Sequence, residues 1–482
     1  MQEKPTQALN LPDIVGLVVG AIVGADIYVA SAFGSGALGP ASLVGWLLAG
    51  LMAISIALCF AQCAMQVPRV GGPYAYVGEA FGPLAGFEVG WSLWFAEWVS
   101  IAVFPIAFAR YLMVFFPHLA GWQIVLAKAA FVFLITASNY VGTRQAGRFN
   151  DFLTAAKLVP LLLFMLSGLF FFSFYPALAA GNLLPFTPKG WGGFNQSLVL
   201  IFWAYAGFEL ATIPAAEVKD ARRTIPLAIL IGMAIVTIFY LLTNLLLLGV
   251  MSWREVATST APLTSGFQRS VGMLLPGLGG AAAVFMTLGA VVSIAGSDES
   301  GTLGTSRLAY AMAVDGHLPA FFSRLHPKYG TPTASLLFQG ATAFLASLLG
   351  TLGGLIKVAV FFLAVAYLST ALATLKLSRR REARPLRLPG SAVYPYLAFA
   401  SSALLLSQVG LRQALFGLAM LLAGLLVYAY LSPKSEMEEL KIRLQSVEYQ
   451  RERIERTGKR FLARAVLFCY RALGHPPTTS PR

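Results

Sequence analysis

The chain has 482 residues, of which 57% are hydrophobic and only 12% are charged. A soluble globular protein carries about 25% charged residues, so this chain has too few charges for a water-facing surface. The formal net charge of +14 would indicate a nucleic-acid partner in a soluble protein. Here, however, the Lys and Arg residues gather between apolar runs and in the C-terminal segment, as in loops that face an anionic membrane leaflet. The composition therefore excludes nucleic-acid binding and predicts a chain embedded in a lipid bilayer.

Apolar runs long enough to cross a membrane, about 20 residues each, recur along the whole chain. The third and eighth are long, which predicts tilted helices. We expect twelve spans in all: 12–36, 41–66, 84–116, 122–141, 151–175, 196–216, 226–250, 278–312, 333–350, 356–376, 393–410 and 412–431.

The distribution of basic residues predicts the orientation of these spans. If the N-terminus is cytoplasmic, the cytoplasmic loops hold about fourteen Lys and Arg residues, among them Arg69, Arg144 and six between 376 and 387, whereas the opposite loops hold about five. Loops that remain in the cytoplasm are enriched in basic residues. We therefore expect both termini in the cytoplasm of a multi-pass plasma-membrane protein.

Motifs for metal, cofactor or nucleotide chemistry are absent from the sequence. The three cysteines, Cys59, Cys63 and Cys469, form no CxxC and no cluster with histidine, so nothing predicts a metal site. Cys59 and Cys63 share a helix face, and we interpret them as buried small residues in preference to a disulfide. No GxxxxGK[ST] motif indicates direct coupling to ATP. No nucleophile and base are paired as in an enzyme, and no cofactor is expected.

Two of the predicted spans combine small residues with an acid near the middle of the span. In the first, GLVVGAIVGADIYVASAFGSG, Asp26 follows Gly24 and Ala25; in the sixth, LVLIFWAYAGFELATIPAAE, Glu209 follows Gly207 closely. Glycine and proline weaken a helix, and an unwound segment inside a membrane is tolerated only where it lines a cavity. Paired interrupted spans at matching positions predict an inverted-repeat transporter with a site near the midplane. Close packing of small residues between helices is the alternative.

Four segments in order resemble the amino acid–polyamine–organocation transporters, and the resemblance covers roughly residues 12–431. They are GAIVGAD in the first span, VPRVGGPYAYVGEAFGPLAGFEVGW, FWAYAGFE with AAEVKDARRTIPLAI, and GTSRLAYAMAVDGHLPAFFSRLHPKYGTP after the eighth span. The resemblance implies an all-α polytopic protein with a 5+5 inverted repeat, alternating access and a substrate held between spans 1, 3, 6, 8 and 10. The implied division is an N-terminal segment (1–11), two five-helix repeats (12–175 and 196–376), two additional spans (393–431) and a charged amphipathic tail (433–482).

Carried over to this sequence, the resemblance places Gly24, Ala25 and Asp26 in the unwound segment of span 1. Relatives use main-chain amides of small residues there to hold a substrate carboxylate. Asp26 departs from that pattern, and its carboxylate would repel another one unless the side chain points away or is protonated. The residues at the break of span 6, where relatives contact and gate the substrate, are Phe202, Tyr205, Ala206, Gly207 and Glu209.

The resemblance also implies a coupling role for Lys157 in span 5. Some proton-coupled relatives carry a lysine at this position, close to where sodium-coupled members bind sodium. A buried ammonium can exchange its proton during a transport cycle. The alternative is structural, with Lys157 holding spans 1 and 5 together.

Acids within the predicted spans outnumber the bases there. A charge inside a bilayer costs several kcal/mol unless it is paired or hydrated. Either some of these acids are protonated and act in proton transfer, or the site holds a cationic substrate. Glu97 lies near the midplane in span 3 and is a candidate for substrate binding, whereas the adjacent acids of span 8 are candidates for coupling. The acids are Asp26, Glu97, Glu209, Asp298 and Glu299.

The sequence therefore predicts a secondary active transporter, either a proton symporter or an exchanger, for amino acids or related organic amines. A polyamine or diamine porter is the first alternative, favoured by the number of acids. A transporter-like sensor that signals through its tail is the second. A small-molecule substrate, protons and the lipid bilayer are the expected partners, and the sequence leaves the oligomeric state open.

Overall fold

The structure, a computed structural model, describes residues 10–67, 72–141, 146–209, 218–378 and 392–432. Most of the predicted N-terminal segment, the C-terminal tail 433–482, and the basic residues Arg69, Arg144 and those of 379–387 lie outside the described residues. Within these limits the chain is a bundle of helices.

The helices of the first half of the chain run from α1 to η2. Their bounds are α1 (Leu11–Ile22), α2 (Ala25–Leu38), η1 (Gly39–Ala41), α3 (Ser42–Gln66), α4 (Pro73–Phe81), α5 (Pro83–Phe115), α6 (Gly121–Val141), α7 (Ala146–Phe174), α8 (Pro176–Asn182), α9 (Phe194–Phe202) and η2 (Trp203–Tyr205).

The helices of the second half begin after the undescribed segment 210–217. Their bounds are α10 (Ala221–Val250), α11 (Trp253–Thr258), α12 (Pro262–Leu274), α13 (Gly279–Val314), η5 (Ala320–Ser323), α14 (Thr333–Leu349), α15 (Leu352–Leu377), α16 (Tyr394–Gln408) and α17 (Leu411–Leu431).

Eight candidate membrane spans are found among the described residues, and α1 and α14 are shorter apolar helices. Each of the twelve predicted spans coincides with one or two of the helices, which confirms the all-α polytopic fold. The prediction that the third and eighth spans are long is also confirmed, because α5 has 33 residues and α13 has 36. In the sixth predicted span the first helical segment ends at Tyr205, Phe208 and Glu209 form a further short 3₁₀ turn, and residues 210–216 lie outside the described residues.

Four short helices connect the longer ones and were not predicted from the sequence: α4, α8, α11 and α12. None reaches the 18-residue length by which a span is recognised, so a search for apolar runs passes over them.

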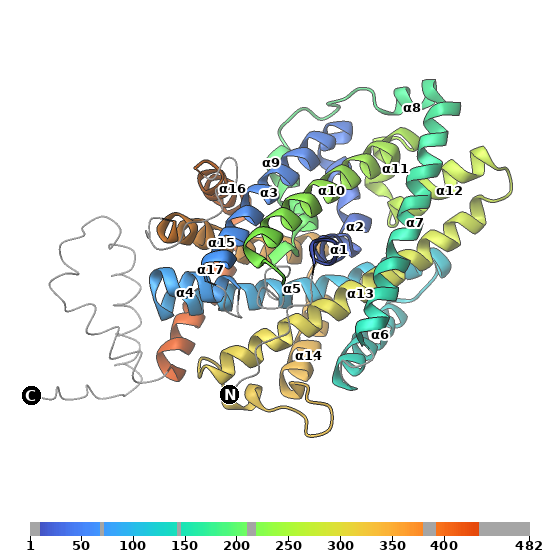
Figure 1. Cartoon of the computed structure of the whole chain (residues 1–482). Coiled ribbons are helices and arrows are strands. Elements are labelled where there is room, and N and C mark those ends of the chain that lie inside the picture. Colours follow the sequence, from blue (N-terminus) through green and yellow to red (C-terminus); the bar gives the residue numbers. More distant parts are fainter. Residues whose placement is uncertain (1–9, 68–71, 142–145, 210–217, 379–391, 433–482) are drawn as a thin grey trace, which may run out of the picture.

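The core of the bundle lies around the divided first span. In Figure 1, α1 lies near the centre and against α10, while α5 and α13 are long helices that pack on each other. α3 packs on α10, and α15 on α5. Glycines permit some of these approaches: a Cβ on Gly50 of α3 would lie 2.5 Å from Cγ2 of Thr237 on α10. Leu126, Phe133 and Leu134 of α6 are exposed, as expected for a helix that faces lipid.

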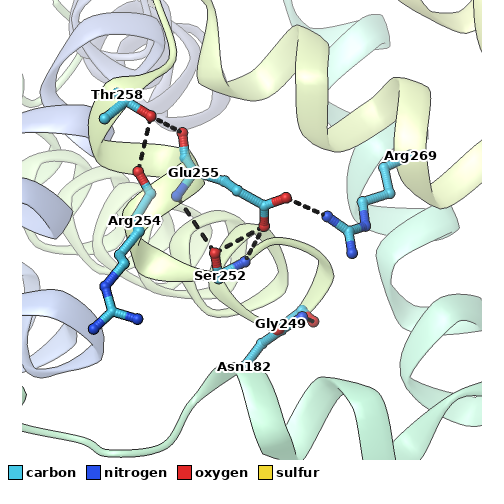
Figure 2. Close-up of polar contacts among 7 residues, drawn as sticks. All are labelled: Asn182, Gly249, Ser252, Arg254, Glu255, Thr258 and Arg269. Atoms are coloured by element: carbon cyan, nitrogen blue, oxygen red, sulfur yellow. Dashed lines mark hydrogen bonds and ion pairs between the residues drawn. The ribbon is translucent and has the colours of Figure 1, made fainter.

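A capped short helix, α11, is joined to α12 at one end of the bundle. Figure 2 shows Ser252 at its start: the main-chain N–H and the hydroxyl of Ser252 each donate to Glu255 Oε2 at 2.8 Å. The other oxygen of Glu255 accepts from Arg269 of α12 at 2.7 Å. Asn182 of α8 donates to the carbonyl of Gly249 at 2.8 Å, which ties α8 to the end of α10. α11 itself packs against α2.

We predict that Glu255→Gln destabilises this end of the bundle in a pH-dependent way. Partial burial raises the pKa of the Glu255 carboxyl, but the hydrogen bonds from Ser252 and the charge of Arg269 outweigh that effect and hold the pKa below its ordinary value. The folded state therefore binds this proton less readily than the unfolded state. The stabilisation that the Glu255 carboxylate contributes to the folded state is fully present above the ordinary glutamate pKa of about 4.3. It is lost as the pH falls through the lower pKa that Glu255 has in the folded state.

The variant should lose up to about 1 kcal/mol at pH 7, because the neutral amide oxygen accepts more weakly from Ser252 and no longer pairs with Arg269. Thermal unfolding of the purified protein at several pH values measures this loss, and the difference from the parent should narrow below about pH 4. Arg269→Gln, which removes only the half-exposed ion pair, should lose a few tenths of a kcal/mol. Equal melting temperatures of the parent and Glu255→Gln at pH 7 would contradict the prediction.

Candidate functional site

The first span is interrupted where the sequence predicted it. α1 ends at Ile22, Val23 is extended (φ −71°, ψ 96°), and α2 begins after Gly24 (φ −143°, ψ −146°). A helix that ends inside the bundle leaves main-chain carbonyls without intrahelical partners. The Gly20 carbonyl accepts from Lys157 Nζ of α7 at 2.5 Å, and the Ile22 carbonyl accepts from Tyr240 Oη of α10 at 2.9 Å.

The second predicted break lies just after η2. Ala206 is extended (φ −66°, ψ 154°), and Gly207 has φ +117°, which favours glycine over any residue with a Cβ. The freed N–H of Gly207 donates to Glu209 Oε2 at 3.1 Å. The first span is therefore divided as predicted, and the sixth span leaves its regular helix at Ala206 and Gly207, where the second break was predicted.

The two breaks meet each other. A Cβ built on Gly207 would lie 2.9 Å from the carbonyl oxygen of Ala21, in the last turn of α1. The contact thus joins main chain to main chain. On another side, a Cβ on Gly24 would lie 2.3 Å from Ser297 Oγ, so the first break also lies directly against α13. The two breaks and α13 therefore surround the same region of the bundle interior, and residues from both halves of the chain contribute to it.

Three predicted acids converge on this place. Asp26 lies in the first turn of α2, Glu97 near the middle of α5, and Glu209 after the second break. The charges of Asp26 and Glu209 both act on Glu97. Lys157 is the cation whose charge acts on Asp26, although the two form no direct ion pair among those found in the described residues. The two breaks and α5 therefore bring three carboxyl groups together.

The acids differ in how they are bonded. Glu209 is buried and accepts from Tyr367 Oη of α15 at 3.3 Å, besides the amide of Gly207. Asp26 is 8% exposed, yet its Oδ1 has no hydrogen-bond partner in the described part of the chain. The side chain of Ala25, the residue before it, is outside the described set.

The aromatic residues of span 6 do not all face the breaks. Phe202 packs edge-on against Tyr367, with ring centroids 6.1 Å apart. Tyr205 instead donates its hydroxyl to the Trp46 carbonyl at 2.8 Å and packs on Tyr240 at 5.2 Å. Tyr205 therefore joins α3 and α10, a structural contact that differs from the predicted role of touching substrate.

The two acids of span 8 lie elsewhere around α13. Asp298 is 1% exposed and accepts from Thr302 Oγ1 at 3.5 Å, whereas the main-chain carbonyl of Glu299 accepts from Asn139 of α6 at 3.4 Å. Gln339 of α14 donates to the Thr302 carbonyl at 2.7 Å. Successive residues leave a helix about 100° apart, so these acids point away from the face on which Ser297 meets Gly24.

Three residues at the site were missed by the sequence reading: Tyr240, Ser297 and Tyr367. Each lies in a predicted span, but tyrosine and serine are common in helix interfaces, so residue type alone gives no signal. Only the positions of the breaks relative to α10, α13 and α15 identify them.

The contact between Gly24 and Ser297 leads to a compensation experiment. Gly24→Ala should weaken folding or activity, because the added methyl would clash with Ser297 Oγ. Ser297 Cβ would lie at 3.5 Å from that methyl, an ordinary contact. The double variant Gly24→Ala with Ser297→Ala should therefore recover most of the loss. The melting temperature and the yield of folded protein measure this recovery, and the single variant Ser297→Ala is the control. A double variant no better than Gly24→Ala would show that the clash is not the cause.

Comparison with known proteins agrees with this architecture. A family model described as amino acid permease matches residues 9–427. The branched-chain amino acid permease of Bacillus subtilis (strain 168) is 26% identical over 441 residues, which cover 88% of this chain and 92% of the relative. The serine/threonine exchanger of that organism is 28% identical, covering 86% and 94%, and its methylthioribose transporter is 28% identical, covering 70% and 74%. Because the family model spans most of the chain, the protein belongs to the amino acid permease family.

Proposed function

We propose that this protein is a secondary active transporter that carries amino acids or related organic amines by alternating access. The observation that supports this function is the contact between the two broken spans, with α5, α13 and α15 around it. Main-chain groups freed at such breaks can bind the polar groups of a small substrate. The family membership and the names of the relatives support the same substrate class.

The substrate site that we propose lies where the breaks meet. Gly24, Asp26, Gly207 and Glu209 come from the breaks themselves, and Glu97 reaches them from α5. Ala25, Ala206 and Phe202 belong to the same segments and complete the proposed site. Tyr205 remains in the proposal only as a residue that holds the second break in place, because its hydroxyl bonds to Trp46.

The wider organisation is proposed on the same grounds. We expect residues 12–175 and 196–376 to form the two inverted repeats, since each opens with a broken span. The basic residues favour a cytoplasmic location of both termini in the plasma membrane. None of the three relatives reported above is named as a polyamine porter or as a sensor, so these alternatives gain no support from them. No covalent chemistry is proposed.

Uptake into proteoliposomes tests the function directly. Purified protein should accumulate one or more labelled compounds from a panel of neutral, acidic and basic amino acids and amines, and preloading with the same compound should accelerate exchange. Empty liposomes and liposomes with heat-denatured protein are the controls. Absence of uptake and of exchange by folded protein across the panel would refute the transport function.

We propose that Lys157 couples transport to protons. Its ammonium donates to the Gly20 carbonyl in the last turn of α1 and acts on Asp26. Loss of its proton would remove a cation from the C-terminal end of α1, where the helix dipole favours positive charge. Proton binding and the conformation of the first break would therefore depend on each other. Asp298 and Glu299 remain secondary candidates, because they lie on other sides of α13.

Substitutions of Lys157 test this coupling. Lys157→Met should abolish the stimulation of uptake by an inward proton gradient, while exchange without a gradient continues at a reduced rate. Lys157→Arg, which remains charged at every relevant pH, should also lose the stimulation. Uptake with and without the gradient measures both variants.

Tyr240→Phe is the matched control, because it removes the neighbouring hydrogen bond to the Ile22 carbonyl without changing a titrating group. It should lower stability and keep the stimulation by the gradient. Full stimulation in Lys157→Met would exclude Lys157 from the coupling.

A further inference from the structure

We infer that Asp298 is a second proton-binding group, separate from the proposed substrate site, and that it exchanges its proton with the cytoplasm between α6, α13 and α14. The path of this proton, called here the polar track, is lined by Thr302, Gln339, Asn139 and Ser335. The inference rests on the proposed transport function, because the proton on Asp298 would regulate transport.

Asp298 is a buried acid on a side of α13 that the proposed substrate site does not use. Its side chain is 1% exposed, and the donor found for it in the described residues is Thr302, whose Oγ1 lies 3.5 Å from Asp298 Oδ1. The two residues are four apart and share a helix face. A buried carboxyl group ionises only if donors surround it. Asp298 can therefore release its proton only where further donors, such as water molecules, reach it.

Gln339 of α14 leaves an oxygen atom without a donor close to Thr302. Its Nε2 donates to the Thr302 carbonyl at 2.7 Å. A carbonyl only accepts, so this bond fixes the orientation of the amide group, and Gln339 Oε1 points away from that carbonyl. Oε1 is buried and has no partner in the described part of the chain. An acceptor thus remains on the α14 side of Thr302.

Two more unpartnered oxygen atoms lie at the same interface. Ser335 is one turn before Gln339 on α14, it is 1% exposed, and its hydroxyl has no partner among the described residues. Asn139 of α6 donates through Nδ2 to two main-chain carbonyls, one of them on α13, which leaves its Oδ1 buried and unpartnered within the described ranges. Ordered water commonly satisfies such atoms. Water molecules along the polar track would give all three oxygens a donor.

The polar track reaches the end of the bundle that we expect to be cytoplasmic. Ser335 lies in the first turn of α14, and Asn139 lies in the last turn of α6. The connection before α14 is largely exposed between 324 and 330. It carries Arg324 and Lys328, two of the basic residues that predict the cytoplasmic side. The proton would therefore exchange with cytoplasmic water.

In the opposite direction the same interface is apolar. Ala343, one turn beyond Gln339 on α14, packs with Ile101 and Ala102 of α5 in a cluster of buried apolar residues. A buried apolar layer offers water no polar partner. Asp298 would therefore exchange its proton with one side of the membrane, whereas a transported proton must reach both sides. This difference favours a regulatory role for the proton on Asp298.

The charged and titratable groups around Asp298 are few. Glu299, on the same helix, is the group whose charge acts on it. α14 has no ionisable side chain, and α5 contributes Glu97. α6 contributes Lys128, which donates to a carbonyl near the far end of α14, and Tyr140, which packs against the connection before α14. Because no ion pair of Asp298 is found in the described residues, a proton is the positive charge available to it.

The charge of Asp298 would act on the first break. The residue before it, Ser297, lies with its Oγ directly against Gly24, so a movement of this turn of α13 reaches the divided span. Loss of the proton favours conformations in which more water reaches the carboxylate, and proton binding favours close packing of α6, α13 and α14. The cytoplasmic pH would thereby change the balance between two conformations of the transporter.

Infrared spectroscopy of the purified full chain tests the proton site. In the proton release, the O–H bond of the Asp298 carboxyl breaks, the proton passes to water, and the electron pair stays on the carboxylate. The protonated group has a C=O absorption that shifts in D₂O, and Asp298→Asn should remove this absorption. Ser335→Ala and Gln339→Met should each slow the shift at least about tenfold, because each removes a polar group that assists proton transfer.

Ser347→Ala is the matched control for these variants. Ser347 lies in the same helix as Ser335 and is equally buried, but its hydroxyl donates to the Phe344 carbonyl at 2.7 Å. It also lies beyond Ala343, outside the polar track. The Asp298 absorption of this variant should shift as fast as that of the parent.

The pH dependence of exchange tests the regulation. Exchange of a transported compound is measured in proteoliposomes of known orientation while the pH of one side is varied. The difference between the parent and Asp298→Asn should follow the pH on the cytoplasmic side of the protein and not the pH on the opposite side. The variant should lose this dependence and continue to exchange the compound.

The outcomes separate this inference from the transport function. If Asp298→Asn removes no carboxyl absorption, or keeps the parent's dependence on cytoplasmic pH, the inference is overturned and the transport function stands. A shift as fast in Ser335→Ala and Gln339→Met as in the parent would overturn the route. If folded protein transports nothing, the proposed function fails. An absorption that Asp298→Asn removes, and that shifts more slowly in Ser335→Ala, would then still support the proton site.

Discussion

Main-chain groups that are freed inside a membrane must find partners within the protein, and this constraint organises the centre of the bundle. Water is not available there, and an unpaired carbonyl or N–H is unfavourable. Lys157 of α7 and Tyr240 of α10 bond the carbonyls at the end of α1, and Glu209 bonds the N–H of Gly207. Glu209 is itself held by Tyr367 of α15. The breaks can therefore exist only because three other helices are in place, and the substrate site that we propose is a product of the whole fold.

The same bonds determine which polar groups remain for a ligand. Lys157 could have paired with Asp26, but its hydrogen bond is to the Gly20 carbonyl. A lysine that satisfies a carbonyl leaves the carboxylate beside it without a donor. The need to pair the main-chain carbonyls at the end of α1 thus determines which side-chain groups remain available to a ligand. The carboxyl group that remains without a donor can bind a proton or a polar group of a ligand.

Much of the fold could be predicted from the sequence, because membrane spans are a property of local composition. Twelve apolar runs coincide with helices, and the glycine-containing breaks at Gly24 and Gly207 lie where the small residues and acids indicated. The family resemblance added the expectation of a 5+5 inverted repeat followed by two additional spans. The short helices α4, α8, α11 and α12 were not foreseen, since their lengths give no membrane signal.

The site was only partly predictable, because the direction of a side chain depends on tertiary packing. Asp26, Glu97 and Glu209 do converge, but Tyr205 turns to Trp46, and Asp298 and Glu299 leave α13 on other sides. A shift of one residue along a helix turns a side chain by about 100°, which the position of a span along the chain does not resolve. Tyr367 and Ser297 were missed for the same reason.

The two central glycines differ in what they touch, and this difference has an evolutionary consequence. Gly24 faces a side chain, Ser297, whereas Gly207 faces the main chain of Ala21 and also has a positive φ. A larger residue at position 24 can be accommodated by a smaller one at 297, so these two positions can drift together. No substitution at position 21 can remove a main-chain oxygen. Position 207 is therefore restricted to glycine for as long as the two breaks remain in contact, whatever substrate the site comes to accept.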